Sequence, residues 1–142
     1  MKSQQQKHIC IACALILAAA TFMLSGCSGG GVSAQTGNDG ENTLQLTVVP
    51  DRLNVTDSGS CTVKVVLWDA NGEPLEGTVA LSTTLGSLGS SSLSTASNPD
   101  GATAGATTTL TANNADTVGN AVVTATFGTI QVWVTVEFYK TL

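Results

Sequence analysis

Four cysteines and one histidine are the side chains of this 142-residue chain that most readily act as nucleophiles, general bases or metal ligands. Cys10 and Cys13 have the C-x-x-C spacing of thiol redox sites, and His8 stands just before them. All three lie in or beside a continuous apolar segment near the N-terminus, which makes a redox motif implausible. The chemistry of the chain therefore depends on what Cys27 and Cys61 do.

The N-terminal segment has the composition of a secretory signal. Two lysines stand in a short polar start, and the residues from Ile9 to Leu24 form a 16-residue apolar run. A transmembrane helix is the weaker alternative, because spanning a bilayer takes roughly 20 residues. We predict that residues 1–26 are removed. The remaining chain has no histidine, so a Ser-His-Asp or Cys-His catalytic arrangement cannot form.

Cys27 follows this segment within the sequence Leu24-Ser25-Gly26-Cys27. These four residues resemble the lipobox of bacterial lipoproteins, in which an aliphatic residue and two small residues precede the cysteine. The resemblance implies that the Cys27 thiol carries a diacylglyceryl group and that the mature chain is held to a membrane. Each buried CH₂ group contributes roughly 0.8 kcal/mol, so two or three acyl chains anchor a protein firmly. An ordinary signal with a chance cysteine is the alternative.

The residue after Cys27 indicates where the protein is sorted, and lipidation of Cys27 determines whether its thiol can form a disulfide. In enteric-type bacteria, a residue other than aspartate at this place, here Ser28, resembles a sorting signal for the outer membrane. We therefore expect the protein in the cell envelope, anchored by lipid, at the outer membrane. A disulfide between Cys27 and Cys61 is the alternative use of the two thiols in an oxidising compartment, and lipidation of Cys27 makes it improbable.

The charge of the mature chain excludes one class of partner. Three basic and all ten acidic residues follow residue 26, which gives a net charge of −7. Binding to nucleic acid comes mainly from neutralising phosphates, so nucleic acid is not an expected partner. We find no catalytic set, and we expect no enzyme activity, no cofactor and no metal. The segment from Asp69 to Pro74 could be a calcium loop, but Asn71-Gly72 favours a tight turn.

The sequence after Cys27 divides into a tether and a domain. Residues 27–42 are rich in glycine and serine and have no hydrophobic periodicity, which predicts a flexible tether with a span on the order of 20 Å. Residues 43–142 have a different pattern, in which apolar and polar residues alternate. The runs that alternate are LQLTVV (44–49), SCTVKVVLW (60–68), GTVALSTT (77–84), AGATTTLTA (104–112), NAVVTATFG (120–128) and TIQVWVTVEF (129–138).

Short alternating runs separated by Gly, Asn, Asp, Pro and Ser predict an all-β fold. About a hundred residues of this kind suit an Ig-like antiparallel β-sandwich of about seven strands. Three stretches also resemble bacterial Ig-like domains of group 1, the invasin/intimin type: VVLWDANGEPLEGTVALST, NPDGATAGATTTLTA and GNAVVTATFG. The resemblance implies the fold over Leu44 to Phe138. The 142 residues contain one such unit and no cell-binding tip, so an adhesin activity is not carried over.

Three side chains of the domain need an explanation. Cys61 shares its parity with Val63, which predicts a buried, inert thiol, with a reactive or intermolecular thiol as the alternative. Trp68 and Trp133 stand opposite the core residues of their strands and are candidate contacts for a partner. The alternatives for both are partial cover by a neighbouring loop or strand, or a strand register that differs from the one inferred. The two tryptophans are expected in different sheets.

Two functions are compatible with these features. The first is a non-enzymatic, lipid-anchored module of the cell envelope that contacts another envelope protein or a surface polymer, in adhesion, in assembly of a surface structure or as a spacer. The second is a carbohydrate-binding module that uses an outward-facing tryptophan. The last strand, from Ile130 to Phe138, could also pair with another chain if it lies at a sheet edge.

Overall fold

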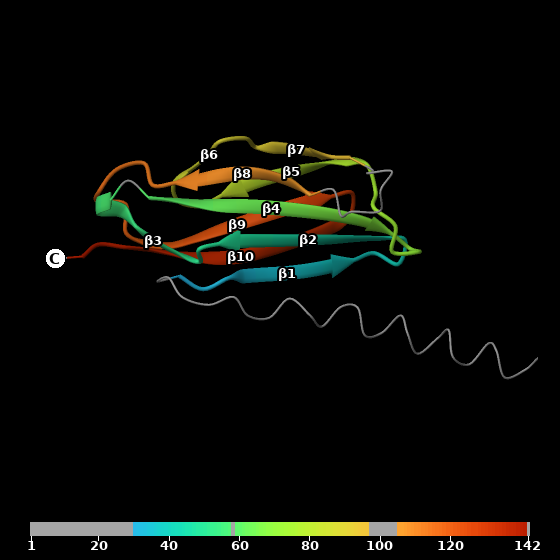
Figure 1. The fold of residues 1–142 in the computed structure, drawn as a ribbon, viewed down its shortest axis with the longest axis horizontal. Coiled ribbons are helices and arrows are strands. Elements are labelled where there is room, and N and C mark those ends of the chain that lie inside the picture. Colours follow the sequence, from blue (N-terminus) through green and yellow to red (C-terminus); the bar gives the residue numbers. More distant parts are fainter. Residues whose placement is uncertain (1–29, 58, 97–104, 142) are drawn as a thin grey trace, which may run out of the picture.

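The computed structural model describes residues 30–57, 59–96 and 105–141. These residues form ten strands and one short 3₁₀ helix in two sheets (Figure 1). The elements, in chain order, are β1 (Ser33–Asn38), β2 (Asn42–Val49), β3 (Arg52–Asn54), η1 (Val55–Asp57), β4 (Ser60–Asp69), β5 (Gly77–Thr83), β6 (Ser87–Leu88), β7 (Ser92–Thr95), β8 (Ala106–Thr111), β9 (Gly119–Phe127) and β10 (Ile130–Tyr139). In this part of the chain no helix is long and apolar enough to cross a membrane. The predicted signal, Cys27 and residue 142 lie outside the described residues.

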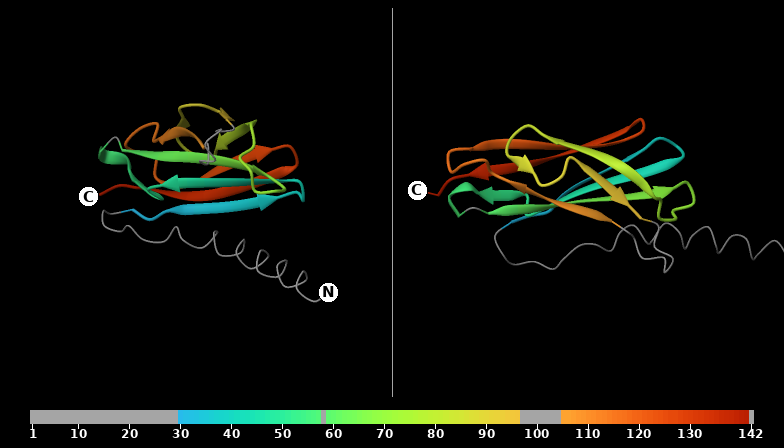
Figure 2. Two further views of the ribbon diagram at one scale, coloured as in Figure 1. Left: turned by 45° about the vertical axis from the view of Figure 1, so that its right-hand side comes forward. Right: turned by 90° about the horizontal axis from the view of Figure 1, so that it is seen from above.

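Two five-stranded sheets pack face to face. The first has the order β1-β2-β4-β8-β6 and the second has the order β3-β10-β9-β5-β7. We call them sheet A and sheet B. Figures 1 and 2 show that the strands of both sheets run along the long axis of the domain. The predicted all-β sandwich is confirmed, although ten strands replace the expected seven or so, and β3 pairs in parallel with β10.

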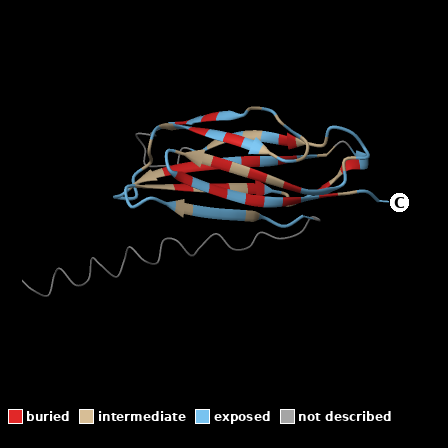
Figure 3. Ribbon diagram, turned by 180° about the vertical axis from the view of Figure 1, so that it is seen from behind, coloured by how far each residue is buried: buried red, intermediate tan, exposed pale blue. Residues whose placement is uncertain are grey.

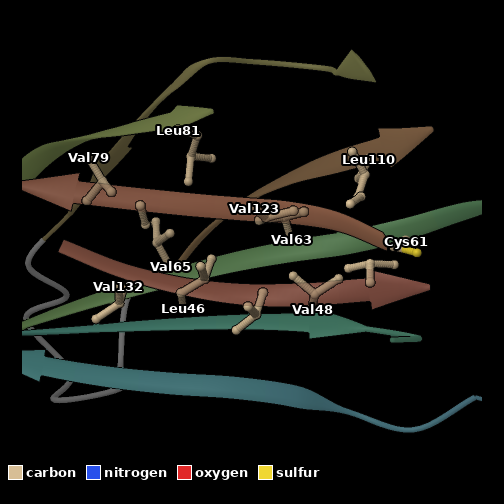
Figure 4. Packing of buried hydrophobic residues seen from close by; sticks show 14 of the residues in the cluster. Leu46, Val48, Cys61, Val63, Val65, Val79, Leu81, Leu110, Val123 and Val132 are labelled. Atoms are coloured by element: carbon tan, nitrogen blue, oxygen red, sulfur yellow. The ribbon is translucent and has the colours of Figure 1, made fainter. Parts of the chain in front are cut away.

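The alternation seen in the sequence builds the core. Along β10 every second residue, from Ile130 to Phe138, is buried, and the residues between them are exposed. The same pattern is visible as alternating buried and exposed segments along the ribbons in Figure 3. The buried faces of the two sheets meet in one cluster of aliphatic side chains, with Phe138 the largest of them, and Figure 4 shows part of this cluster. Val66 departs from its parity: it is only 4% exposed, and Gly105, just before β8, comes so close that a Cβ there would lie 3.2 Å from a Val66 methyl group.

Strand β1 corrects the predicted tether. Residues 33–38 were expected to be flexible, but they pair antiparallel with β2 over their whole length. The polar sequence SAQTGN buries no side chain, so the strand is held mainly by backbone pairing, which hydrophobic periodicity cannot reveal. Gly37 faces β10 so closely that a Cβ there would lie 2.7 Å from a Val132 methyl group. The folded domain therefore begins near residue 30 rather than at residue 43.

The turn that joins β1 to β2 is encoded by its side chains. The Asn38 side-chain oxygen accepts a hydrogen bond from the Gly40 N–H, and an Asp39 carboxylate oxygen accepts from the N–H groups of Glu41 and Asn42. The bond from Asn42, followed by that from Glu41, holds the pKa of Asp39 below its ordinary value. Gly40 has a φ of +96°, which glycine adopts without steric cost. This turn sits at the end of the domain opposite the start of β1.

Strand β10 is only partly an edge strand. Its end pairs with β3, where Glu137, Phe138 and Tyr139 lie opposite Arg52, Leu53 and Asn54. β3 is the outermost strand of sheet B, and its pairing with β10 covers just these three residues. Among the described strands, the first half of β10 has no partner on the edge away from β9. There it packs against β1 of the other sheet, which approaches through Gly37. Pairing of β10 with another chain was expected only at an edge position, and only the backbone of that first half lacks a partner strand in the described part of sheet B.

Candidate functional site

Trp133 is the most prominent exposed aromatic side chain of the described residues. It lies on β10 between Val132 and Val134, both buried, and its own side chain is 59% exposed. The strand pleat directs it away from the core, together with Gln131 and Thr135. Large apolar side chains at such positions lose hydration energy when a partner covers them. Trp133 is therefore the natural centre of a contact surface.

The residues around Trp133 come from the strands next to β10 in sheet B. Thr124 on β9 lies directly opposite Trp133, and Ser82 on β5 lies opposite Thr124. The neighbouring row crosses the same strands from Gln131 on β10 to Thr126 on β9 and Ala80 on β5. We call this outward surface the Trp133 face. It consists of Gln131, Trp133 and Thr135 on β10, Val122, Thr124 and Thr126 on β9, and Ala80 and Ser82 on β5.

Charged groups stand at one end of this face. Arg52 Nε donates to a carboxylate oxygen of Glu137 at 2.8 Å, and the Arg52 guanidinium lies 4.9 Å from the centre of the Tyr139 ring. These contacts join β3 to the last residues of β10. Both partners of the ion pair are half exposed, so the pair adds at most about 1 kcal/mol of stability. Its main effect is to neutralise the charge nearest to the Trp133 face.

Trp68 belongs to a different environment. It lies on β4 in sheet A and is half-buried, because the chain folds back after the turn so that Pro74 forms an isolated bridge with it. The Leu75 N–H also donates to the Leu67 carbonyl at 3.0 Å. The two tryptophans therefore lie in separate sheets, as expected, and form no common patch. Partial cover by a neighbouring segment, the alternative considered for both, applies to Trp68.

The segment from Asp69 to Pro74 forms a turn. One Asp69 carboxylate oxygen accepts hydrogen bonds from the Asn71 N–H at 2.8 Å and the Glu73 N–H at 2.9 Å. The Glu73 bond, with smaller contributions from Asn71 and Gly72, lowers the pKa of Asp69. The carboxylate is thus occupied by its own backbone, which is what a turn requires. Within the described residues no three His, Cys, Asp or Glu side chains gather where they could hold a metal ion.

A shallow depression lies at the end of the sandwich near η1. Its lining residues are Val55, Thr56, Gly59, Thr111, Ala112, Asn113, Asn114 and Ala115. None of these side chains is ionisable, so the depression offers no general acid or general base. It does not qualify as a catalytic pocket.

Cys61 is buried at the start of β4, in the core between the two sheets (Figure 4). Burial, with a smaller effect of the nearby Asp51 charge, raises the pKa of its thiol from 9.0 to about 11. The thiolate is the reactive form, so the folded protein holds Cys61 in its unreactive state. The expectation of a buried thiol is confirmed.

We expect Cys61 to react with a thiol reagent only when the domain unfolds. At pH 8 the native protein should label slowly, and 8 M urea should give full labelling at this residue, identified by mass spectrometry of its peptide. Between pH 9 and 11 the unfolded thiol ionises while the folded thiol stays protonated. Stability should therefore fall as the pH rises through this window, and less so in Cys61→Ala. Prompt labelling of the native protein would contradict this prediction.

Comparison with known proteins supports the fold. No family model matches the chain, and a search of curated proteins found no match. Among solved structures, the chain is similar to a C-terminal 282-residue fragment of intimin in complex with the intimin-binding domain of the translocated intimin receptor. The identity is 22%, the TM-score is 0.56, and the match covers 75% of this chain and 34% of that one.

A second similar structure is the D0-D1 domain of intimin, at 15% identity and a TM-score of 0.53, with 84% of this chain and 87% of that chain covered. The chain therefore spans about a third of the larger intimin fragment and most of the smaller one. At these identities the similarity defines a class by its fold. The chain is an all-β, Ig-like sandwich of the kind found in intimin.

Proposed function

We propose that this protein is a non-enzymatic, lipid-anchored module of the bacterial cell envelope that works by contact. The observation that carries the proposal is the exposure of Trp133 on an uncharged outer face of sheet B. The intimin-like fold agrees with it, since one of the similar structures is an intimin fragment bound to a receptor domain. The role of the contact is adhesion, assembly of a surface structure or spacing between envelope components.

The anchor part of the proposal rests on Cys27. The sequence Leu24-Ser25-Gly26-Cys27 resembles a lipobox and follows a segment with the properties of a secretory signal. The thiol is also the only one left after signal removal besides Cys61, which is buried in the core. Ser28 supports the outer membrane as the destination. Lipid at Cys27 would leave the whole sandwich free to face the periplasm or the cell exterior.

Replacing Cys27 with Ala should move the protein from the membrane fraction to the soluble fraction. The full chain is expressed in a bacterium that processes lipoproteins, and the fractions are compared by immunoblot and by incorporation of radiolabelled palmitate. Cys61→Ala is the matched control, because it removes a thiol without removing the anchor, and it should stay in the membrane and keep the label. Retention of Cys27→Ala in the membrane would overturn the lipid anchor.

The contact part of the proposal is tested separately, by treating intact cells with protease. An adhesin-type role requires the domain to face outward, so it should be cleaved in intact cells at a rate close to that in lysed cells. Full protection in intact cells, with cleavage after lysis, would exclude adhesion and leave assembly or spacing within the envelope.

A further inference from the structure

The Trp133 face carries no ionisable side chain, although the protein as a whole is strongly acidic. Its members are one aromatic residue, one amide, two small apolar residues and four hydroxyl-bearing residues. The nearest carboxylate along β10 is that of Glu137, and it is paired with Arg52. A ligand on this face would therefore meet no unpaired charge. Electrostatics favour an uncharged partner here.

The hydroxyl groups of this face are free for a ligand. Among the side-chain hydrogen bonds of residues 30–57, 59–96 and 105–141, none involves Ser82, Thr124, Thr126 or Thr135. A hydroxyl has one donor and two acceptor positions, so each of these groups can both give and accept a hydrogen bond. A polyhydroxyl ligand needs this dual capacity, because its own hydroxyls are donors and acceptors at once.

The geometry of the sheet arranges these groups in rows. Adjacent strands lie about 4.8 Å apart, and outward residues on one strand follow each other at about 6.7 Å. Trp133, Thr124 and Ser82 form one row across three strands, and Gln131, Thr126 and Ala80 form the next. Trp133 thus stands at one end of a row across the sheet, and the row continues with Thr124 and Ser82. An extended chain of repeating units can follow such a row and contact it at successive units.

Other partners fit the face poorly. Cores of protein interfaces are enriched in aromatic residues, Met and Arg and depleted in Ser, whereas here one tryptophan is surrounded by hydroxyls. A membrane surface or a nucleic acid would require Lys or Arg, which the face lacks. Aromatic rings combine a large apolar area with a defined geometry, and this suits the apolar faces of sugar rings.

From these features we propose that the Trp133 face binds a neutral polysaccharide. Trp133 stacks on one sugar ring, and Thr124 and Ser82 form hydrogen bonds with hydroxyls further along the same polysaccharide chain. This inference rests on the proposed contact function and names the class of its partner. It assigns no role to Trp68, which lies half-buried in the other sheet.

The test is native gel electrophoresis of the full, processed chain, extracted in a non-ionic detergent, through gels that contain a polysaccharide. The neutral probes are laminarin, yeast mannan, dextran and hydroxyethylcellulose, and the charged probes are heparin and polygalacturonate. At least one neutral probe should retard the protein, and the charged probes should not. Trp133→Ala should weaken the retarding interaction at least tenfold, and Trp133→Phe should recover part of it.

Matched variants separate recognition from folding. Ser82→Ala and Thr124→Val remove hydroxyls that make no bond within the described structure, so they should weaken binding a few-fold without lowering the melting temperature. Thr62→Val on β4 removes an exposed hydroxyl from the outer surface of sheet A and should bind as the wild type does. Equal loss with Thr62→Val would show a nonspecific effect and overturn the assignment to this face.

Three further results would overturn the inference. The first is that none of the four neutral polysaccharides retards the protein. The second is that Trp133→Ala binds like the wild type. The third is that sedimentation shows a dimer that Trp133→Ala dissociates, which would make the face an interface between two copies. Envelope fractionation of Cys27→Ala is independent of all three, so a failure of the anchor and a failure of polysaccharide binding are distinguished.

Discussion

Phe138→Ala should destabilise the domain by about 3–5 kcal/mol, a large part of the total stability of a domain of this size. Phe138 is the largest fully buried side chain, at 1% exposure, and it lies near the end of β10 where the two sheets meet. Truncation to Ala removes the ring and leaves a cavity that a rigid sandwich cannot fill. The measurement is urea unfolding followed by circular dichroism.

Trp133→Ala is the matched control for this prediction. It removes a larger aromatic side chain from the same strand, but on the exposed face, and its cost should be within about 0.5 kcal/mol of zero. The two variants together test the alternation of β10 directly. If Trp133→Ala were costly and Phe138→Ala were not, the strand would have the opposite register, and equal costs would mean that β10 does not separate a buried face from an exposed one.

Gly86→Ala is the second prediction with a large effect, and we expect a loss of about 2–4 kcal/mol. Gly86 has a φ of +77°, which costs an L-residue about 1 kcal/mol. In addition, a Cβ at this position would collide with the Thr111 carbonyl oxygen and lie 2.9 Å from the Phe138 ring. The backbone and the buried ring cannot both move away, so overpacking adds about 1–3 kcal/mol to the conformational cost.

Gly72→Ala measures the cost of the positive φ alone, without the collision. Gly72 has a similar φ of +81°, but a Cβ there would meet no atom within 4 Å. This variant should therefore lose only about 1 kcal/mol. The difference between the two variants in urea unfolding measures the collision at Gly86. Equal losses would mean that β6, Thr111 and Phe138 are not packed as described.

The core of the sandwich could be predicted from sequence because burial follows strand parity. Val132, Val134 and Phe138 are buried and Trp133 is exposed, as alternation along the last strand required. β1 could not be predicted in this way, since Ser33–Asn38 buries no side chain and is held by backbone pairing and by the close approach of Gly37. β3 is too short, at three residues, for a periodic pattern to appear.

The candidate site was predictable only in part. The outward parity of Trp133 was evident, but the identity of its neighbours depends on which strands lie beside β10 and in which register. Thr124 and Ser82 are distant in sequence from each other, and only the β5-β9-β10 pairing brings them into one row. The partial burial of Trp68 likewise depends on the bridge that Pro74 forms with it after the turn, and no local sequence pattern predicts this bridge.

The early start of β1 sets how far the domain can reach. With Cys27 lipidated as proposed, Ser28 to Val32 is all that separates the anchor from Ser33, the first residue of the strand. Such a segment extends to at most about 20 Å, whereas a linker running to residue 42 could extend to about 50 Å. The turns at residues 38–42 and at Gly128 lie at the far end of β1, about 20 Å beyond Ser33. Trp133 would therefore stay close to the bilayer surface, and a partner would have to approach the membrane to be bound.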